Sequence, residues 1–244
     1  MDNYAVVTGG SRNIGAAIAA RLSAQGMQVI VVDMIPPEHD RLAEFVHADL
    51  TDPKAAAQAL GKVVAGRRVT RFVHNAGMGR FALVDKIDLA DVSAMFNVTV
   101  GSLIALGQVL LPSMRNAGIG RIVAIGSGAA RGREGRTGYA ASKSALGGLA
   151  RTWALELGRE GVTVNVIHPG PIRTTLFDYG NPPDHPKTKA MIANIAVGRI
   201  GLPDDIAAAV AFLCSDDASF ITGQELSVCG GTSIRGSPSP GRTD

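Results

Sequence analysis

The stretch Tyr4-Ala-Val-Val-Thr-Gly-Gly-Ser-Arg-Asn-Ile-Gly15 decides the fold of this chain. Its first half is a short β-branched run of the kind that forms a buried strand, and Ala16-Ala-Ile-Ala-Ala20 predicts a helix straight after the glycine-rich turn. Glycines at such a turn let the backbone approach a pyrophosphate, which then lies at the positive N-terminus of the helix. The stretch therefore predicts a strand, a phosphate-binding turn and a helix.

The next strand places a carboxylate where a dinucleotide-binding fold needs one. The β-branched run Gln28-Val-Ile-Val-Val-Asp33 ends in Asp33, about twenty residues after the turn. An acidic side chain at this place holds the ribose 2′-hydroxyl. A glycine-rich turn alone is a weak signal, but the order strand, turn, helix, strand and aspartate strongly indicates a dinucleotide.

Short apolar strands alternate with helical stretches along the rest of the chain. This alternation predicts one doubly wound α/β domain of Rossmann type over residues 1–234, with a seven-stranded parallel sheet and the ligand at the carboxyl edge of the strands. Residues 235–244 are Gly/Ser/Pro-rich and predicted to be disordered, and the interval after Asp33, which contains Pro36-Pro37, is expected to hold little helix. Strands are expected at Ala5–Thr8, Val29–Asp33, Phe45–Ala48, Arg71–His74, Arg121–Gly126, Val162–Ile167 and Glu225–Val228.

A second informative stretch is Tyr139-Ala-Ala-Ser-Lys143, with Ser127 twelve residues upstream. If residues 139–159 are helical, Tyr139 and Lys143 share a face because they are four residues apart. A nearby ammonium favours phenolate and lowers a tyrosine pKa that is otherwise about 10. Ser127 could hydrogen-bond the oxygen that exchanges the proton. This chemistry interconverts an alcohol and a carbonyl, and the pattern gains its weight from the dinucleotide turn at the other end of the chain.

The motifs together resemble those of the short-chain dehydrogenase/reductase family, from about Tyr4 to Ile234. The resemblance implies a nicotinamide coenzyme, a small-molecule secondary alcohol or ketone as substrate, and a homo-oligomer, most often a tetramer, with a dimer as the alternative. Further matches to the family pattern, in chain order, are Asp49-Leu50, Asn75-Ala76-Gly77 at the end of the fourth strand, Asn97, and Pro169-Gly170-x-x-x-Thr174.

The resemblance also implies roles for individual residues. Tyr139 would exchange the proton and Lys143 would hold the nicotinamide ribose. Ser127 would orient the substrate oxygen, and Asn97 would hold a water that connects the site to solvent; a satisfied buried amide is the alternative for Asn97. The coenzyme-binding residues that it implies are Gly9, Ser11, Arg12, Asn13, Ile14, Gly15, Asp33, Asp49, Leu50, Asn75, Ala76, Gly77, Tyr139, Lys143, Pro169, Gly170, Ile172 and Thr174.

Two residues bear on the coenzyme in opposite directions. Asp33 can accept both ribose hydroxyls of NAD and would repel a 2′-phosphate, whereas Arg12 could reach that phosphate and favour NADP. No basic residue directly follows Asp33, so NAD is the predicted coenzyme and NADP the alternative. Asn13 stands where the family usually has glycine, and we expect it to adopt the left-handed conformation, with its side chain near the phosphates.

Two segments and one histidine near the expected site each have two interpretations. Arg131, Arg133 and Arg136 lie between Ser127 and Tyr139 and could bind a carboxylate of an anionic substrate, or belong to a solvated loop. Residues 174–195 have the composition of a lid, or of a surface loop. His168, beside Pro169, is interpreted as structural rather than catalytic.

Composition favours a large globular enzyme. The 244 residues are 46% hydrophobic, enough for one α/β domain with a full core, and a net charge of +3 is too small to imply a nucleic-acid partner. Apolar runs of strand length predict no membrane span, and five scattered histidines predict no metal site. Two cysteines and no visible leader favour the cytoplasm. The competing functions are a 3-oxoacyl thioester reductase and a non-catalytic dinucleotide-sensing protein.

Overall fold

The computed structural model describes residues 3–37 and 43–234. A single parallel sheet lies at its centre. All strand pairs are parallel and the order is β3-β2-β1-β4-β5-β6-β7, which confirms the predicted seven-stranded doubly wound fold. The predicted tail, 235–244, and most of the interval between the second and third strands lie outside the described residues. The strands are β1 (Asn3–Thr8), β2 (Gln28–Asp33), β3 (Ala43–His47), β4 (Arg68–His74), β5 (Gly120–Ile125), β6 (Val162–Pro169) and β7 (Glu225–Val228).

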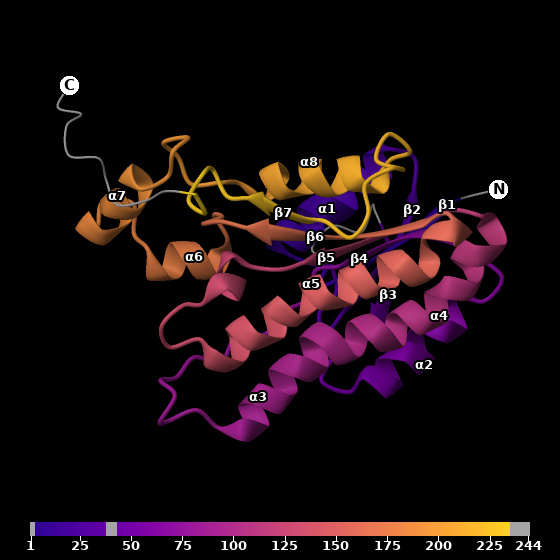
Figure 1. Ribbon diagram of the computed structural model, residues 1–244, viewed down its shortest axis with the longest axis horizontal. Coiled ribbons are helices and arrows are strands. Elements are labelled where there is room, and N and C mark those ends of the chain that lie inside the picture. Colours follow the sequence, from indigo (N-terminus) through magenta and orange to yellow (C-terminus); the bar gives the residue numbers. More distant parts are fainter. Residues whose placement is uncertain (1–2, 38–42, 235–244) are drawn as a thin grey trace.

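Helices cover both faces of the sheet. Figure 1 shows α1 and α8 on one face, α2, α4 and α5 on the other, and α6 and α7 beyond the carboxyl ends of the strands. The helices are α1 (Asn13–Ala24), α2 (Pro53–Val64), α3 (Leu89–Phe96), α4 (Ser102–Ala117), α5 (Thr137–Leu157), α6 (Thr175–Gly180), α7 (Pro186–Ala193) and α8 (Pro203–Cys214). Short turns of other helical types are η1 (Asn97–Gly101, π), η2 (Gly128–Arg131, 3₁₀) and η3 (Gly158–Glu160, 3₁₀).

Side chains of the central strands alternate between two apolar layers, as the period of a strand requires. Val6 of β1 packs in one cluster with Leu106 of α4 and Leu146 of α5, whereas its neighbour Val7 packs in the other with Ile206 of α8. Complete burial of such a Leu, Ile or Val side chain contributes roughly 1.5–3 kcal/mol. The sheet therefore has an apolar core layer on each of its two faces.

The strand order reverses at the carboxyl ends of β1 and β4. Thr8 pairs with Val32 of β2 and His74 of β4, so the three strands end at the same level. The chain leaves β1 toward β2, and β4 returns on the other side of β1. Ligands of doubly wound sheets bind in the crevice where the strand order reverses in this way. The glycine-rich turn follows β1 at this point.

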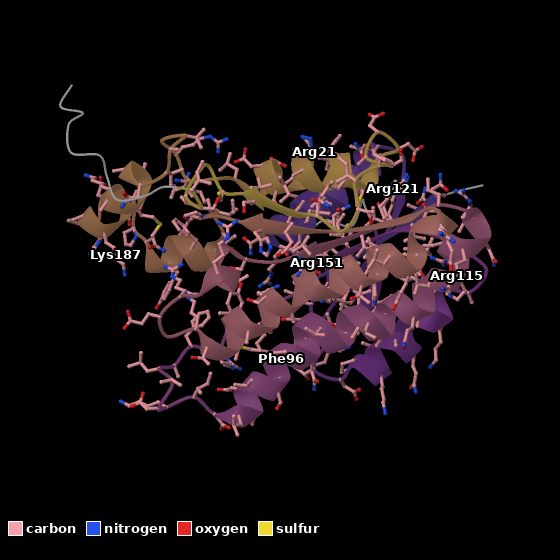
Figure 2. All side chains as sticks on the ribbon, viewed as in Figure 1. Arg21, Phe96, Arg115, Arg121, Arg151 and Lys187 are labelled. Carbon is pink, nitrogen blue, oxygen red and sulfur yellow. The ribbon has the colours of Figure 1, made fainter. Side chains whose placement is uncertain are left out.

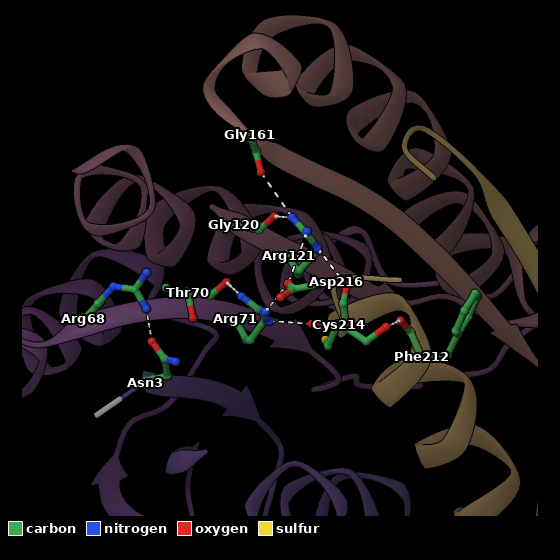
Figure 3. Close-up of polar contacts among 11 residues, drawn as sticks. Asn3, Arg68, Thr70, Arg71, Gly120, Arg121, Gly161, Phe212, Cys214 and Asp216 are labelled. Atoms are coloured by element: carbon green, nitrogen blue, oxygen red, sulfur yellow. Dashed lines mark hydrogen bonds and ion pairs between the residues drawn. The ribbon is translucent and has the colours of Figure 1, made fainter. Parts of the chain in front are cut away.

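Two buried arginines anchor α8 nearer the amino ends of the strands. Arg71 of β4 and Arg121 of β5 are partners in register and only 8% and 4% exposed. Their Nε atoms donate to the carbonyls of Cys214 and Ser215, and both guanidinium groups face the Asp216 carboxylate, at 3.2 and 3.6 Å (Figure 3). Since cations stabilise the C-terminus of a helix, this cluster fixes the end of α8.

One helical run is longer and more apolar than the sequence suggested. Residues 89–117, through α3, η1 and α4, form a continuous helix with the length and composition of a membrane span. Part of this apolar surface belongs to the core, since Leu103, Leu106 and Leu110 are buried in the layer between the sheet and the helices. Packing inside the domain accounts for these side chains, whereas Leu89 and Ile104 of the same run are exposed.

Candidate active site

The glycine-rich turn forms an open cradle at the N-terminus of α1. Gly9 and Asn13 both adopt the left-handed conformation, with φ of +61° and +50°. A side chain at Gly15 would overlap the carbonyl of Gly9, so only glycine lets the helix pack this closely. Ser11 is buried and Ile14 packs into the layer below α1. The predicted strand, turn and helix are therefore present, and the turn has the left-handed residues and close helix packing typical of phosphate-binding turns.

Hydrogen bonds join this turn to the end of β4. Thr8 Oγ1 accepts from the amides of Asn75 and Ala76, both at 3.1 Å. The Asn75 side chain donates to the carbonyl of Gly9 at 2.9 Å. Gly77 comes next, and a Cβ there would lie 3.3 Å from Nζ of Lys143. The predicted Asn75-Ala76-Gly77 segment thus forms the wall of the crevice opposite the turn.

Asp33 lies at the end of β2 with its carboxylate turned to the same cradle. Its Oδ2 accepts from the Ser11 amide at 3.1 Å, and its Oδ1 accepts from the Met34 amide at 2.7 Å. The Ser11 hydroxyl donates to the carbonyl of Ile35 at 2.6 Å. The carboxylate is therefore held beside the turn, where a ribose of the coenzyme would lie.

Asn97 begins the π-helical turn η1 between α3 and α4. Its side-chain amide donates to the carbonyl of Thr51 at 3.1 Å. Thr51 follows the predicted pair Asp49-Leu50, in which Asp49 accepts from the Thr51 amide at 2.8 Å and Leu50 is buried. Among the described residues, no hydrogen bond joins Asn97 to Tyr139 or Lys143. Single π turns inside helices occur often at functional sites.

Lys143 is a buried cation at the carboxyl end of β5. Its side chain is 2% exposed and Nζ donates to the carbonyl of Ile125 at 2.7 Å. Burial lowers the pKa of Lys143 from its ordinary 10.5 to about 8. The ammonium therefore stays charged at neutral pH while facing the crevice beside Gly77.

His74 is a buried neighbour that the sequence analysis did not single out. Burial, and then the nearby ammonium of Lys143, lower the pKa of His74 to about 3. Its ring nitrogens contact Thr8 Oγ1 at 3.0 Å and the carbonyl of Val98 at 3.1 Å. A neutral imidazole at this place supports the end of β1 without adding a second charge beside Lys143. No local pattern distinguishes it from an ordinary strand residue.

Tyr139 lies one helical turn before Lys143, near the start of α5, and is half-buried. Its ring meets Phe81 edge to face, with centroids 5.7 Å apart and an interplanar angle of 86°. The guanidinium of Arg136 lies over the Phe81 ring at 3.9 Å and 5.9 Å from the Tyr139 ring. Phe81 is a site residue without a sequence signal. The two aromatic rings and the guanidinium form a stack beside the predicted acid–base group.

Ser127 follows β5 by two residues and begins the turn η2. Its Oγ accepts from the amide of Ala129 at 3.1 Å, which leaves the hydroxyl proton available as a donor. The turn η2 packs against α5. Because Lys143 reaches the carbonyl of Ile125, the Tyr139–Lys143 face of α5 lies at the same carboxyl end of β5 that Ser127 follows.

The predicted segment after β6 lies beyond the carboxyl end of that strand. Pro169 is the last residue of β6, and a side chain at Gly170 would crowd the backbone of Cys229. Ile172 is buried, and Thr174 Oγ1 accepts from the amide of Phe177 at 3.2 Å, which caps α6. Residues 174–195 contain the helices α6 and α7, where the sequence suggested a long loop.

The three arginines between Ser127 and Tyr139 have different surroundings. Arg131 donates to the carbonyl of Ser233 at 3.1 Å and to Ser227 Oγ at 3.0 Å, away from Tyr139. Arg133 is exposed, and Arg136 stacks beside Tyr139. Of the three, Arg136 is the one that contacts the predicted site. Within residues 3–37 and 43–234, no cluster of His, Cys, Asp or Glu is arranged to hold a metal.

Comparison with other proteins agrees with this geometry. The family model described as Enoyl-(Acyl carrier protein) reductase matches residues 9–233. The chain is 37% identical to the short-chain reductase protein NovJ of Streptomyces niveus, over 94% of each chain. It is 34% identical to 3-oxoacyl-(acyl-carrier-protein) reductase FabG of Escherichia coli (93% of this chain, 96% of that one) and 35% identical to acetoacetyl-CoA reductase of Shinella zoogloeoides (95% and 98%).

Solved structures with the same fold also match nearly the whole chain. A blue fluorescent protein from a metagenomic library, crystallised in complex with NADPH, superposes with a TM-score of 0.84 at 36% identity, over 94% of this chain and 97% of that one. Levodione reductase superposes with a TM-score of 0.86 at 28% identity, over 96% and 98%. The family model and these relatives match nearly the whole chain, including the glycine-rich turn and the Tyr139–Lys143 pair. The chain therefore belongs to the short-chain dehydrogenase/reductase family of oxidoreductases.

Proposed function

We propose that the chain interconverts a secondary alcohol and the matching ketone, with Tyr139 as the acid–base group. A nicotinamide dinucleotide, when bound, supplies or accepts the hydride. In reduction, Tyr139 donates its phenolic proton to the carbonyl oxygen, and in oxidation its phenolate accepts the hydroxyl proton. A positioned group of this kind accelerates a reaction by about 10²–10⁴-fold.

Three side chains assist Tyr139 in this proposal. The Lys143 ammonium stabilises negative charge on the phenolic oxygen and contacts the coenzyme ribose beside Gly77. Ser127 donates its hydroxyl proton to the substrate oxygen, which its capping bond from Ala129 leaves free to do. Asn97 holds a water that links the site to solvent, a role that its position in the π-helical turn supports.

The buried ammonium of Lys143 is the observation that carries the proposal. A charge with 2% exposure costs stability, and strongly perturbed groups of this kind cluster at functional sites. The test is a panel of secondary alcohols and ketones, assayed with NAD(H) and NADP(H) by the absorbance of the reduced nicotinamide. Turnover of at least one member is expected. Coenzyme binding with no turnover across the panel would favour a dinucleotide-sensing protein instead.

We propose NAD as the preferred coenzyme. The Asp33 carboxylate, held beside the turn by the amides of Ser11 and Met34, supports this choice because a 2′-phosphate would meet like charge there. NADP is the alternative, supported by Arg12 in the turn and by the NADPH of the similar blue fluorescent protein.

Reduction of a 3-oxoacyl thioester is the second candidate function. Similarity to FabG and to acetoacetyl-CoA reductase supports it. Acetoacetyl-CoA is the probe, because it carries the ketone on a coenzyme A thioester. A kcat/KM for acetoacetyl-CoA well above that for every simple ketone of the panel would favour this function, and no detectable turnover would exclude it.

We also propose that the substrate carries a negative charge near the reacting carbon. The support is Arg136, which stacks on Phe81 beside Tyr139 and has no carboxylate partner among the described residues. Guanidinium groups bind carboxylates in a two-pronged geometry, and stacking on an aromatic ring keeps the fork in place. A carboxylate-bearing ketone should then bind better than its neutral ester.

A homo-oligomer, most often a tetramer in this family, and a cytoplasmic location complete the proposal. Exposed apolar side chains on α4, α5 and α8, namely Ile104, Leu155 and Phe212, support contacts between subunits. The free thiols of Cys214 and Cys229 suit a reducing compartment. Light scattering of the purified chain tests the oligomer, and a monomer mass at micromolar concentration would contradict it.

A further inference from the structure

A histidine side chain extends the hydrogen-bond ladder between β5 and β6 at Ser127. The backbone ladder ends where the amide of Gly126 donates to the carbonyl of Ile167 at 2.7 Å. The next amide, that of Ser127, donates instead to Nδ1 of His168 at 3.1 Å. The same nitrogen lies 2.9 Å from the Ser127 carbonyl oxygen. Both backbone polar groups of Ser127 therefore face one imidazole.

Glu225 holds the other nitrogen of this ring. Its Oε2 lies 2.9 Å from Nε2 of His168, and its Oε1 accepts from Arg151, which extends from α5 (Figure 2). Burial raises the pKa of the Glu225 carboxyl, but hydrogen bonds from His168 and Arg151 outweigh burial and keep the pKa below its ordinary value. His168 itself is 6% exposed. An ionised carboxylate thus anchors a buried imidazole.

His168 and Glu225 can hold the backbone of Ser127 whether the imidazole carries one proton or two. With one proton on the ring, Nε2–H donates to Glu225 and Nδ1 accepts from the Ser127 amide. With both nitrogens protonated, Nε2–H still donates to Glu225 and Nδ1–H donates to the Ser127 carbonyl. In both states the imidazole keeps its bond to the carboxylate and one bond to the Ser127 backbone.

Two glycines leave the space that this arrangement needs. A Cβ at Gly126 would overlap the imidazole of His168, and a Cβ at Gly147 of α5 would overlap the carboxylate of Glu225. Neither glycine has a positive φ, so close approach and not backbone conformation explains the residue type. Residues that follow β5, and residues of β6, α5 and β7, are thus fitted around one pair of side chains.

We propose that His168 and Glu225 are positioning residues, which hold the Ser127 backbone so that its hydroxyl points at the substrate oxygen. The proposal rests on the role of Ser127 proposed above. Hydrogen-bond donors accelerate a reaction when they are held in place before the charge develops, and displacement by about 1 Å can cost about 100-fold in rate. Loss of His168 should therefore lower kcat more than it weakens coenzyme binding.

The test is a double-mutant cycle between His168 and Ser127 in the full chain. His168→Leu and Ser127→Ala are made singly and together, and kcat and KM are measured with the fastest ketone of the panel. Coenzyme Kd and urea unfolding are measured alongside. His168→Leu should lower kcat about 10- to 100-fold with coenzyme Kd within about twofold of wild type. In the Ser127→Ala background, the same change should lower kcat by less than about twofold, since both residues act through one hydroxyl.

Two milder variants separate positioning from folding. His168→Asn keeps a polar group at the place of Nδ1 and should retain more activity than His168→Leu. Glu225→Gln keeps the shape of the carboxylate and should lower kcat by about three- to tenfold, roughly the value of one ordinary hydrogen bond. Arg115→Ala, which removes an exposed partner of Glu160 outside this network, is the control and should stay within about twofold of wild type. These variants decide the question even if His168→Leu fails to fold.

Unchanged kcat in folded His168→Leu, or in both milder variants, would overturn the proposal. An equal loss on His168→Leu in wild-type and Ser127→Ala backgrounds would also overturn it, because His168 would then act independently of Ser127. Full activity in Ser127→Ala would remove Ser127 from the reaction and this proposal with it. A loss in Ser127→Ala beside full activity in His168→Leu would overturn the positioning role alone.

Discussion

Asn13 of the coenzyme turn accepts two hydrogen bonds from Thr175, 162 residues later in the chain. Its Oδ1 lies 3.1 Å from the Thr175 amide and 3.2 Å from the Thr175 hydroxyl. Asn13 presents this oxygen from a left-handed backbone with φ of +50°, which asparagine tolerates best after glycine. The turn that would hold the phosphates is thereby tied to the start of α6.

Asn13→Gly should keep the fold and loosen α6. Glycine adopts the left-handed conformation without steric cost, so the free energy of unfolding should change by less than about 1 kcal/mol. Thr175 loses its acceptor, so its amide should exchange faster with deuterium in the coenzyme-free protein. Asn13→Asp keeps the acceptor oxygen and is the matched control. Unchanged exchange at Thr175 in the glycine variant would contradict the link.

Asp33→Ala should relax the coenzyme preference. Repulsion between Asp33 and a 2′-phosphate of about 1.4 kcal/mol gives tenfold discrimination, so the wild type should favour NAD(H) in kcat/KM by about that factor or more. The variant should bring the ratio of kcat/KM values toward one. Arg12→Ala, the complementary change, should lower kcat/KM with NADP(H) alone. A wild type that prefers NADP(H) would mean that Arg12 outweighs Asp33.

Lys143→Met should stabilise the coenzyme-free protein while abolishing turnover. Burial lowers the pKa of Lys143 from 10.5 to about 8, so below pH 8 the folded state carries the full cost of the buried charge. Between about pH 8 and 10.5 the unfolded chain binds more protons than the folded one, and the wild type gains stability as the pH rises. Methionine fills a similar volume without a charge.

Urea unfolding at several pH values checks this expectation. At pH 7 Lys143→Met should exceed the wild type in free energy of unfolding by up to about 3 kcal/mol, and the advantage should disappear near pH 10.5. A variant less stable than the wild type at pH 7 would mean that the bond from Lys143 to the Ile125 carbonyl outweighs the cost of burying the charge.

Arg136→Gln should raise KM for a carboxylate-bearing ketone and leave its methyl ester almost unaffected. A partly exposed ion pair contributes about 1 kcal/mol, so KM for the acid should rise about fivefold, and salt should reduce the effect. Arg133→Ala, a change in the same segment at an exposed residue, is the control. If acid and ester lose equally, Arg136 supports Phe81 and Tyr139 by stacking and does not bind the substrate.

The sequence sufficed for the parts of the structure that follow from local patterns. Every predicted strand is present within a few residues, because β-branched runs between turns mark buried strands clearly. Parallel strands then bring their carboxyl ends together, so the turn after β1, Asp33 and Ser127 fall at one edge. Spacing along α5 likewise put Tyr139 and Lys143 on one face.

Contacts between distant segments had no such signal. His168 meets Glu225, and Phe81 meets Tyr139, only because β6 pairs with β7 and the segment after β4 passes over α5. The helices α6 and α7 were missed although Thr174 caps one and Pro186 begins the other, because Gly, Asn and Pro between them outweighed these local signs.

Replacement of Tyr139 by phenylalanine tests the central claim most directly. Phenylalanine keeps the ring against Phe81 and removes only the hydroxyl, so coenzyme Kd should stay within about twofold of wild type while kcat falls by about 10²–10⁴-fold. Steady-state turnover of the best panel substrate, followed by the absorbance of the reduced nicotinamide, measures kcat, and fluorescence titration measures Kd. A folded Tyr139→Phe variant that turns over within a few-fold of wild type would contradict the account, because the proton would then come from another group.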